Sequence, residues 1–144
     1  MSRLLAIDYG SRRTGIAVSD PMQMIAQALT TVPTHELTTF LERYMAEEPV
    51  ERVIIGRPLQ STGELSENAA GVDMFIRAFK RRFPEVPIET ADERFTSVLA
   101  HDVMLQSGIG KQKRRDKALV DKISATIILQ GYMESRRIAG GMAH

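Results

Sequence analysis

The sequence contains no cysteine. The chain therefore has no disulfide framework and no thiolate nucleophile, and any bound metal must be held by aspartate, glutamate or histidine. Such ligands favour hard cations such as Mg²⁺ or Mn²⁺. The sequence also has no apolar run of about 18 residues and no signal-peptide core, so we expect a cytoplasmic protein that does not enter a membrane.

An excess of charge of either sign is also missing, because 19 Lys and Arg against 18 Asp and Glu give a formal net charge of +1. This balance does not by itself indicate a polyanionic partner, since nucleic-acid-binding proteins usually concentrate their basic residues in a patch. A charged run is more often solvated surface than a binding site, so both interpretations stay open. One such run, which we call the basic segment, comprises Lys111, Lys113, Arg114, Arg115 and Lys117.

No internal repeat, low-complexity tract or linker divides the 144 residues, and we expect one domain over residues 1–144. Apolar stretches bounded by turn residues predict five strands, at residues 4–9, 14–19, 24–32, 52–56 and 86–91. Gly10 and Gly15 are expected to be turn glycines, and they do not form a P-loop.

Apolar residues spaced by three and four positions predict four helices between and after these strands. We expect the first to follow an N-cap at Thr34, the second a capping box of Ser61 and Glu64, and the others to span 96–107 and 117–137. Three strands in a meander, then alternating helices and strands, predict an α/β fold. The order is that of the ribonuclease H-like arrangement, a mixed five-stranded sheet flanked by helices.

Asp8 is the acid of an otherwise apolar strand, Leu-Leu-Ala-Ile-Asp, at residues 4–8. A buried carboxylate costs free energy unless it is paired or bound to a metal. Asp8 is therefore either a brace for its own turn or a ligand, and this residue alone does not decide between the two.

Asp92, Glu93 and Arg94 follow the last predicted strand. Open α/β sheets bind ligands at the C-terminal ends of their strands, which favours a functional site here. The simpler interpretation is a helix start, where acids are favoured and Thr96 is the N-cap, and it explains Thr96 better than it explains Arg94.

Asp121 is the third candidate acid, in the otherwise apolar last helix. The small residues Ser124 and Ala125 on the next turn would let this helix approach the sheet closely, whereas the simpler interpretation has Asp121 facing solvent. Acids from two strand ends and one helix converge only if all three elements meet at one edge of the sheet. A pair of divalent cations about 3.5–4 Å apart, as in two-metal nucleases, requires that convergence. No histidine base is needed, and three histidines are expected at the surface: His35, His101 and His144.

Five motifs occur in an order that resembles the YqgF family, also called RuvX, over nearly the whole chain. They are Asp-Tyr-Gly at 8–10, Gly-Ile-Ala-Val-Ser-Asp at 15–20, Gly-Arg-Pro-Leu at 56–59, Asp-Glu-Arg-Phe-Thr-Ser at 92–97, and Asp-Lys-Ile-Ser-Ala at 121–125 with Ile-Ile-Leu-Gln at 127–130. Members are regarded as ribonuclease H-like nucleases implicated in trimming the 5′ end of the 16S rRNA precursor, and were earlier described as Holliday-junction resolvases. Two residues depart from the family pattern: Arg57 stands where an apolar residue is usual, and Ser124 where alanine is common.

The resemblance implies that Asp8, Glu93 and Asp121 are catalytic residues that bind Mg²⁺ or Mn²⁺. Glu93 is favoured over its neighbour because alternation along a strand turns only one of two adjacent residues toward a site. Asp92 and Arg94 are then supporting residues. The basic segment leads into the helix that carries Asp121, and we expect it to bind nucleic-acid phosphates.

The implied function is a metal-dependent nuclease, with precursor 16S rRNA favoured over branched DNA as substrate. A Holliday junction resolvase would use the same metal chemistry and would need a symmetric dimer, and the sequence leaves monomer and homodimer open. A non-catalytic RNA-binding ribosome-assembly factor would explain the basic segment, but not Asp8 and Asp121 on apolar elements. An actin-like ATPase needs two such domains around its nucleotide, and this chain has room for one.

Overall fold

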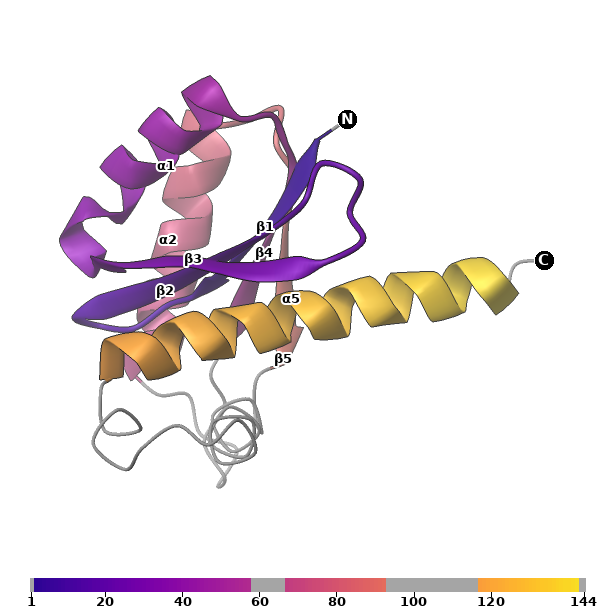
Figure 1. Ribbon diagram of the computed structural model, residues 1–144. Coiled ribbons are helices and arrows are strands. Elements are labelled where there is room, and N and C mark those ends of the chain that lie inside the picture. Colours follow the sequence, from indigo (N-terminus) through magenta and orange to yellow (C-terminus); the bar gives the residue numbers. More distant parts are fainter. Residues whose placement is uncertain (1, 58–66, 93–116, 143–144) are drawn as a thin grey trace.

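A computed structural model describes residues 2–57, 67–92 and 117–142, and these form a sheet with helices on both faces (Figure 1). The sheet contains five strands in the order β3-β2-β1-β4-β5. The elements, in chain order, are β1 (Arg3–Asp8), β2 (Arg13–Ser19), β3 (Ala26–Pro33), the 3-10 turn η1 (Thr34–Glu36), α1 (Leu37–Glu47), β4 (Val50–Arg57), α2 (Glu67–Arg82), β5 (Ile88–Asp92) and α5 (Lys117–Met142).

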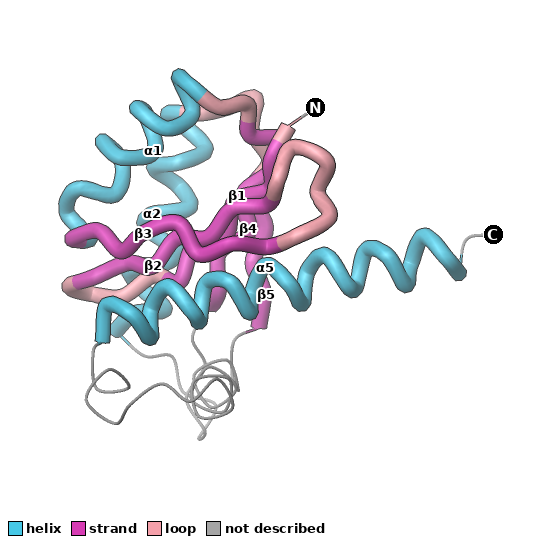
Figure 2. Tube along the Cα trace, in the orientation of Figure 1, coloured by secondary structure: helices cyan, strands magenta, loops and turns pink. Residues whose placement is uncertain are grey.

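Strand direction is mixed, as the sequence predicts. β1, β2 and β3 form an antiparallel meander, whereas β4 and β5 run parallel to β1. The three parallel strands therefore end at the same edge of the sheet, which Figure 2 shows opposite the end where the chain begins. The predicted mixed five-stranded sheet is confirmed.

Each face of the sheet carries its own core, because successive strand residues point to opposite sides. Leu5 and Ile7 of β1 pack with α1 and α2, while Leu4 and Ala6 pack with α5. In α5 the fully buried residues are small or aliphatic, and they include Ala125 and Leu129. Ile128 is also buried, whereas Ile123 and Ile127 are only half-buried, because the helix turns a narrow face to the sheet.

The expected start of β3 at residue 24 is wrong, because Met24 and Ile25 lie in the preceding loop. The Asp20 carboxylate accepts the backbone N–H groups of both residues at 2.7 Å. This local side-chain acceptor competes with strand pairing for the same donors.

The predicted N-cap at Thr34 is wrong, because Thr34 does not cap α1. It begins η1, and α1 starts after Glu36 without a side-chain cap. Gly15 is not a turn glycine either, since it lies within β2 and pairs with Asp8. Gly10 does lie in the turn between β1 and β2, where an added Cβ atom would meet the Arg13 carbonyl oxygen at 2.4 Å.

Other strand and helix boundaries also differ from the predicted ones, some lying earlier in the chain and some later. β4 begins two residues before the predicted 52, β5 begins at Ile88 instead of 86, and α5 continues to Met142. The capping box at residues 61–64 and the helix expected over 96–107 lie outside the described residues. None of the helices in the described segments is long and apolar enough to cross a bilayer.

Candidate active site

The ends of β1, β4 and β5 define an acidic edge of the sheet, which carries Asp8 and Asp92. Ile7 pairs with Ile55 in β4, and the β4–β5 register continues to Arg57 and Asp92. Because the strands are parallel and in register, Asp8 and Asp92 each occupy the last position of their strand at the same edge. The structure thus brings together the backbone of two predicted site segments.

Asp8 lies on the α5 side of the sheet. Leu4 and Ala6 belong to the core under α5, and Asp8 follows them in the same alternation. Its residue is half-buried, and its partner in β2 is Gly15. Gly15 therefore places no side chain beside Asp8 on this face of the sheet.

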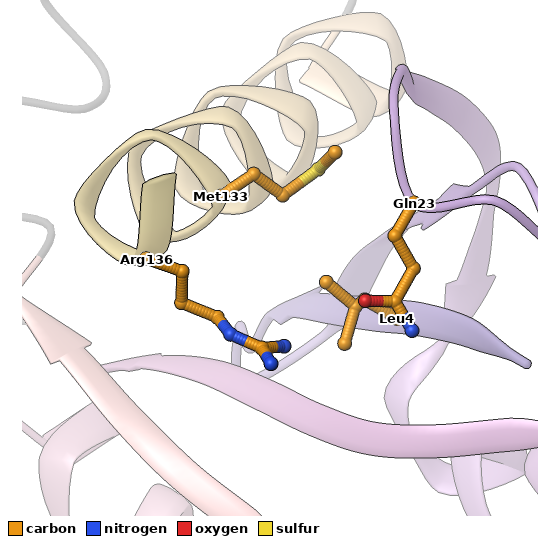
Figure 3. Close-up of a pocket in the computed structure, with 4 residues that line it drawn as sticks. All are labelled: Leu4, Gln23, Met133 and Arg136. Carbon is orange, nitrogen blue, oxygen red and sulfur yellow. The ribbon is translucent and has the colours of Figure 1, made fainter. Parts of the chain in front are cut away.

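α5 runs antiparallel to β1, so its first turns lie toward the acidic edge (Figure 1). Leu4, at the start of β1, lines a cavity of about 220 Å³ together with Met133 and Arg136 of α5 and Gln23 (Figure 3). Asp121 precedes Met133 by about 18 Å along the helix axis. Asp8 follows Leu4 by about 13 Å along the strand. The backbone of Asp121 therefore belongs to the same end of the molecule as Asp8.

Small residues let α5 approach the sheet closely, as the sequence predicts. Ala6 and Ala17 of the sheet and Ala125 of the helix are fully buried in one cluster. Ser124 is also buried, and its hydroxyl oxygen has no hydrogen-bond partner among the described residues. This buried hydroxyl lies one turn after Asp121 in α5.

The turn that follows Asp8 is fixed by Thr34. The Thr34 hydroxyl donates to the Gly10 carbonyl at 2.6 Å, and the Thr34 N–H donates to the Arg12 carbonyl at 2.9 Å. The hydroxyls of Thr14 and Thr34 are 2.9 Å apart. These contacts connect residues twenty or more positions apart and hold the turn in one geometry beside Asp8. This role of Thr34 cannot be predicted from the sequence, because a threonine just before a helix resembles an N-cap.

Tyr9 anchors the other side of Asp8. Its ring lies 5.9 Å from the ring of Phe75 in α2, measured between centroids. It also packs on Gly71, where an added Cβ atom would lie 2.9 Å from Tyr9 Cε1. The hydrogen-bonded turn and the aromatic contact of Tyr9 therefore both limit the motion of the backbone at Asp8.

A polar network fastens α5 to β4 and β5, and no local pattern in the sequence predicts it. Arg52 and Tyr132 both contact Oε2 of Glu89, at 2.9 Å and 2.7 Å. A hydrogen bond from the Tyr132 hydroxyl, and a smaller contribution from Arg52, lower the pKa of the Glu89 carboxyl. Burial and the hydrogen bond to Glu89 raise the pKa of the Tyr132 hydroxyl. Arg136 lies over the Tyr132 ring, 5.8 Å from its centroid, and pairs with Glu51 at 3.6 Å. The network sets the position of the helix that carries Asp121.

Several predicted site residues lie outside the described residues, namely Glu93, Arg94, Lys111, Lys113, Arg114 and Arg115. Lys117 is the first residue of α5. Within the described ranges, no three acidic or histidine side chains form a group that could hold a metal. The metal-ligand set therefore stays a prediction. His35, expected at the surface, is exposed.

Comparison with known proteins gives consistent matches. The family described as "RuvX: Holliday junction resolvase" matches residues 2–135. A protein of Bacteroides thetaiotaomicron named "Putative pre-16S rRNA nuclease" is 63% identical over 137 residues, covering 95% of this chain and 99% of the relative. A Bacteroides fragilis protein of the same name is 59% identical over 138 residues, covering 96% and 100%.

Two solved structures share the fold at 15% sequence identity. Thermus thermophilus RuvC, in complex with a Holliday junction substrate, matches with a TM-score of 0.60 over 95% of this chain and 96% of its own. Fowlpox virus resolvase, in complex with Holliday junction DNA, matches with a TM-score of 0.59 over 92% and 97%. The predicted ribonuclease H-like fold is confirmed.

Proposed function

The chain belongs to the RuvX family, matched over residues 2–135, and from this premise we propose that it is a metal-dependent nuclease that processes the 5′ end of precursor 16S rRNA. The observation that carries the mechanism is the place of Asp8. It is a half-buried carboxylate at the end of β1, on the α5 side of the sheet and opposite a glycine. A carboxylate at the end of a strand that is parallel to its neighbour, at the edge where α/β sheets bind ligands, is suited to hold a metal ion.

We assign metal binding to Asp8, Glu93 and Asp121, with Mg²⁺ or Mn²⁺ as the cation. When bound, the cation supplies an activated water and neutralises charge at the scissile phosphate. The residues of the chain hold it in place. Asp8 is supported by the fixed turn and by Tyr9, and Asp121 by a helix that small residues and the Glu89 network hold against the sheet.

The choice of Glu93 over Asp92 is supported by the alternation of β5. Glu89 bonds Tyr132 of α5, and Ala91 packs in the core under the same helix. Odd-numbered residues of this strand thus share the side of the sheet on which Asp8 lies. Asp92 and Arg94 remain supporting residues in this proposal.

The substrate assignment is supported by the names of the relatives. Proteins 50–63% identical to this chain are named as pre-16S rRNA nucleases, which favours an RNA substrate and a cytoplasmic site of action. A second candidate, cleavage of four-way DNA junctions, is supported by the description of the family and by the junction complexes of the two structural neighbours. Both candidates use the same acidic edge, so the substrate has to be determined by experiment.

The deciding experiment offers purified protein two substrates, a precursor 16S rRNA fragment with its 5′ leader and a four-way DNA junction, with Mg²⁺ or Mn²⁺. We expect cleavage of the RNA leader, no symmetric cutting of the junction, and no reaction in EDTA. Ca²⁺ should support binding only, because it takes more ligands at longer distances. Asp8→Asn serves as the control for a contaminating nuclease. Junction cutting without leader cleavage would replace the RNA assignment with the resolvase one.

A further inference from the structure

The turn between β1 and β2 carries two adjacent arginines, Arg12 and Arg13, within five positions of Asp8. β2 runs antiparallel to β1, so its first residue, Arg13, lies at the edge of the sheet where β1 ends. Arg12 is exposed, whereas Arg13 is half-buried. A basic pair thus shares the acidic edge with Asp8.

Alternation along β2 places Arg13 on the face of the sheet that carries Asp8. Ile16 and Val18 of β2 pack in the core under α1 and α2, whereas Ala17 belongs to the core under α5. Arg13 precedes Ala17 by four residues and therefore shares its side of the sheet, the α5 side.

The strand register sets Arg13 diagonally across from Asp8. Asp8 pairs with Gly15, and Arg13 lies two residues before Gly15, about 7 Å further toward the edge. Residues in this diagonal relation on one face of an antiparallel pair are within reach of a long side chain. The Arg13 guanidinium can therefore reach a group that is bound at Asp8.

The backbone on both sides of Arg13 is fixed by Thr34. The Thr34 N–H donates to the Arg12 carbonyl at 2.9 Å, and the Thr34 hydroxyl lies 2.9 Å from that of Thr14. The turn is also tight before Arg13, since an added Cβ atom at Gly10 would collide with the Arg13 carbonyl oxygen. Arg13 is thus presented from a rigid backbone, which lowers the entropy lost when a ligand is bound.

A guanidinium in this place suits a nucleic-acid phosphate. A cation held by Asp8 neutralises charge at the scissile phosphate, but the phosphates on either side of it still meet an acidic edge. Arginine binds phosphate with two parallel N–H···O bonds, and such charge-assisted bonds are roughly twice as strong as neutral ones. Arg13 therefore supplies at this edge the kind of group that holds a substrate strand in place.

We propose that Arg13 binds the phosphate next to the scissile one and so positions the substrate strand for cleavage. This role rests on the function proposed above and adds to it a residue that contacts the substrate. The rigid turn then serves the reaction, because it fixes the distance between the metal site and the bound phosphate. An arginine that served only as the counter-ion of Asp8 would bind no phosphate, and this difference can be measured.

The first test measures the affinity for a precursor 16S rRNA fragment in Ca²⁺, by fluorescence anisotropy over a range of salt concentrations. Wild type is compared with Arg13→Gln and with Arg43→Gln, a matched control because Arg43 is exposed on α1, on the other face of the sheet. Arg13→Gln should weaken binding roughly tenfold and flatten the slope of log affinity against log salt by about 0.7, as expected for one contact to a single strand. Arg43→Gln should change neither quantity.

Arg13→Lys separates the charge of the side chain from its shape, because lysine keeps the charge and lacks the planar fork. This variant should restore the salt slope of wild type. Its single-turnover rate of RNA cleavage in Mg²⁺ should stay below that of wild type, since a point charge orients the phosphate less well.

An uncharged linkage identifies the contacted phosphate. One methylphosphonate replaces the phosphate on either side of the cleavage site in turn. At the contacted position it should weaken binding to wild type about tenfold and leave binding to Arg13→Gln unchanged, because that contact is already missing. Equal losses in the two proteins at both positions would overturn the proposal.

The other outcomes separate the role of Arg13 from the function on which it rests. If wild type cleaves RNA and Arg13→Gln binds and cleaves it as Arg43→Gln does, Arg13 does not contact the substrate and the nuclease assignment stands. A lower melting temperature of Arg13→Gln in EDTA with an unchanged salt slope would make Arg13 a counter-ion of Asp8 instead. Cleavage of four-way DNA junctions in place of RNA would overturn the substrate assignment alone, provided that Arg13→Gln weakens junction binding. A wild type that cleaves neither would overturn both.

Discussion

Asp8 pairs with Gly15 across the antiparallel β1–β2 ladder, and this pairing places an acid opposite the one residue type that has no side chain. On the same face, Ala6 pairs with Ala17 one step further from the edge, and both are fully buried under α5. The β2 residues that pair with Asp8 and Ala6 on this face are thus the two smallest residue types, which suits the metal site proposed for Asp8.

Asp8→Asn should abolish cleavage and leave the fold intact, because the change keeps the size of the side chain and removes the charge that holds the metal. Removing one of several repelling carboxylates should leave the melting temperature of the metal-free protein unchanged or raise it. Cleavage of a labelled RNA and a thermal melt in EDTA measure the two effects.

Asp20→Ala is the matched control, since the Asp20 carboxylate accepts three backbone N–H groups and has a structural role. This variant should melt at a lower temperature and still cleave RNA at low temperature. If Asp8→Asn were the destabilised variant and retained activity, Asp8 would be a structural acid and the metal-site assignment would be wrong.

Two helical glycines should respond to alanine in opposite directions. An added Cβ atom at Gly131 of α5 meets nothing within 4 Å, so Gly131→Ala should stabilise the protein by about 0.5–1 kcal/mol. At Gly71 the added atom would lie 2.9 Å from the Tyr9 ring, which must then move. Gly71→Ala should therefore destabilise the protein by about 1 kcal/mol.

Because Tyr9 follows Asp8, Gly71→Ala should also slow cleavage, whereas Gly131→Ala should not. Denaturant unfolding and single-turnover kinetics measure the two effects. Equal stabilisation by both substitutions would show that the Tyr9 ring moves freely and does not position Asp8.

The Glu89 network should make stability depend on pH at the acidic end. Since Tyr132 and Arg52 lower the folded-state pKa of Glu89, its contribution is present at neutral pH and is lost as the pH falls from the ordinary glutamate value, about 4.3, through the lowered one. Glu89→Gln should reduce stability at pH 7 by less than about 1 kcal/mol, because the side chain is partly exposed. The difference from wild type should vanish in acid.

Glu47→Gln, at an exposed position of α1, is the control for a general effect of losing one negative charge. Thermal melts from pH 7 to pH 3 compare the three proteins. A Glu89→Gln deficit that persisted unchanged in acid would mean that the charge of Glu89 does not stabilise the network.

The elements that the sequence predicts well are those set by local burial patterns. The sequence predicts β1 and the alternation of its side chains because four of the six residues of this strand are apolar and buried. The predicted start of β3 is wrong because Met24 and Ile25 are apolar, as strand residues often are. Their backbone N–H groups donate to the Asp20 carboxylate, and the two residues therefore lie in a turn. Apolar side chains predict a strand only where their backbone donors are free to pair.

The rest of the site depends on contacts between distant segments, which no local pattern reveals. Thr34 bonds Gly10 across 24 positions, and Tyr132 bonds Glu89 across 43. In the sequence, Thr34 is indistinguishable from a helix cap and Glu89 from a surface glutamate. Asp8 could be identified as an acid on a buried strand, but the residues that fix its position could not.

The basic segment should contribute to RNA affinity through phosphate contacts, since it leads directly into α5 a few residues before Asp121. Its ammonium and guanidinium groups would offset the repulsion between the acidic edge and an incoming polyanion. Replacing Lys113, Arg114 and Arg115 together by alanine should weaken binding regardless of RNA sequence, while the rate on bound substrate falls less. Losing three contacts to a single strand should flatten the slope of log affinity against log salt by up to about 2.

A triple alanine variant at Arg77, Lys80 and Arg81 provides the matched control, because these exposed basic residues lie on α2, on the other face of the sheet. It removes the same charge from the protein, so its RNA affinity and salt slope should stay close to wild type. Fluorescence anisotropy with labelled RNA over a range of salt concentrations, in Ca²⁺ to prevent cleavage, measures both variants. Equal loss of affinity in the two would show a diffuse effect of net charge. Unchanged affinity and slope in the first variant would show that the basic segment is solvated surface, and the RNA would then have to bind elsewhere.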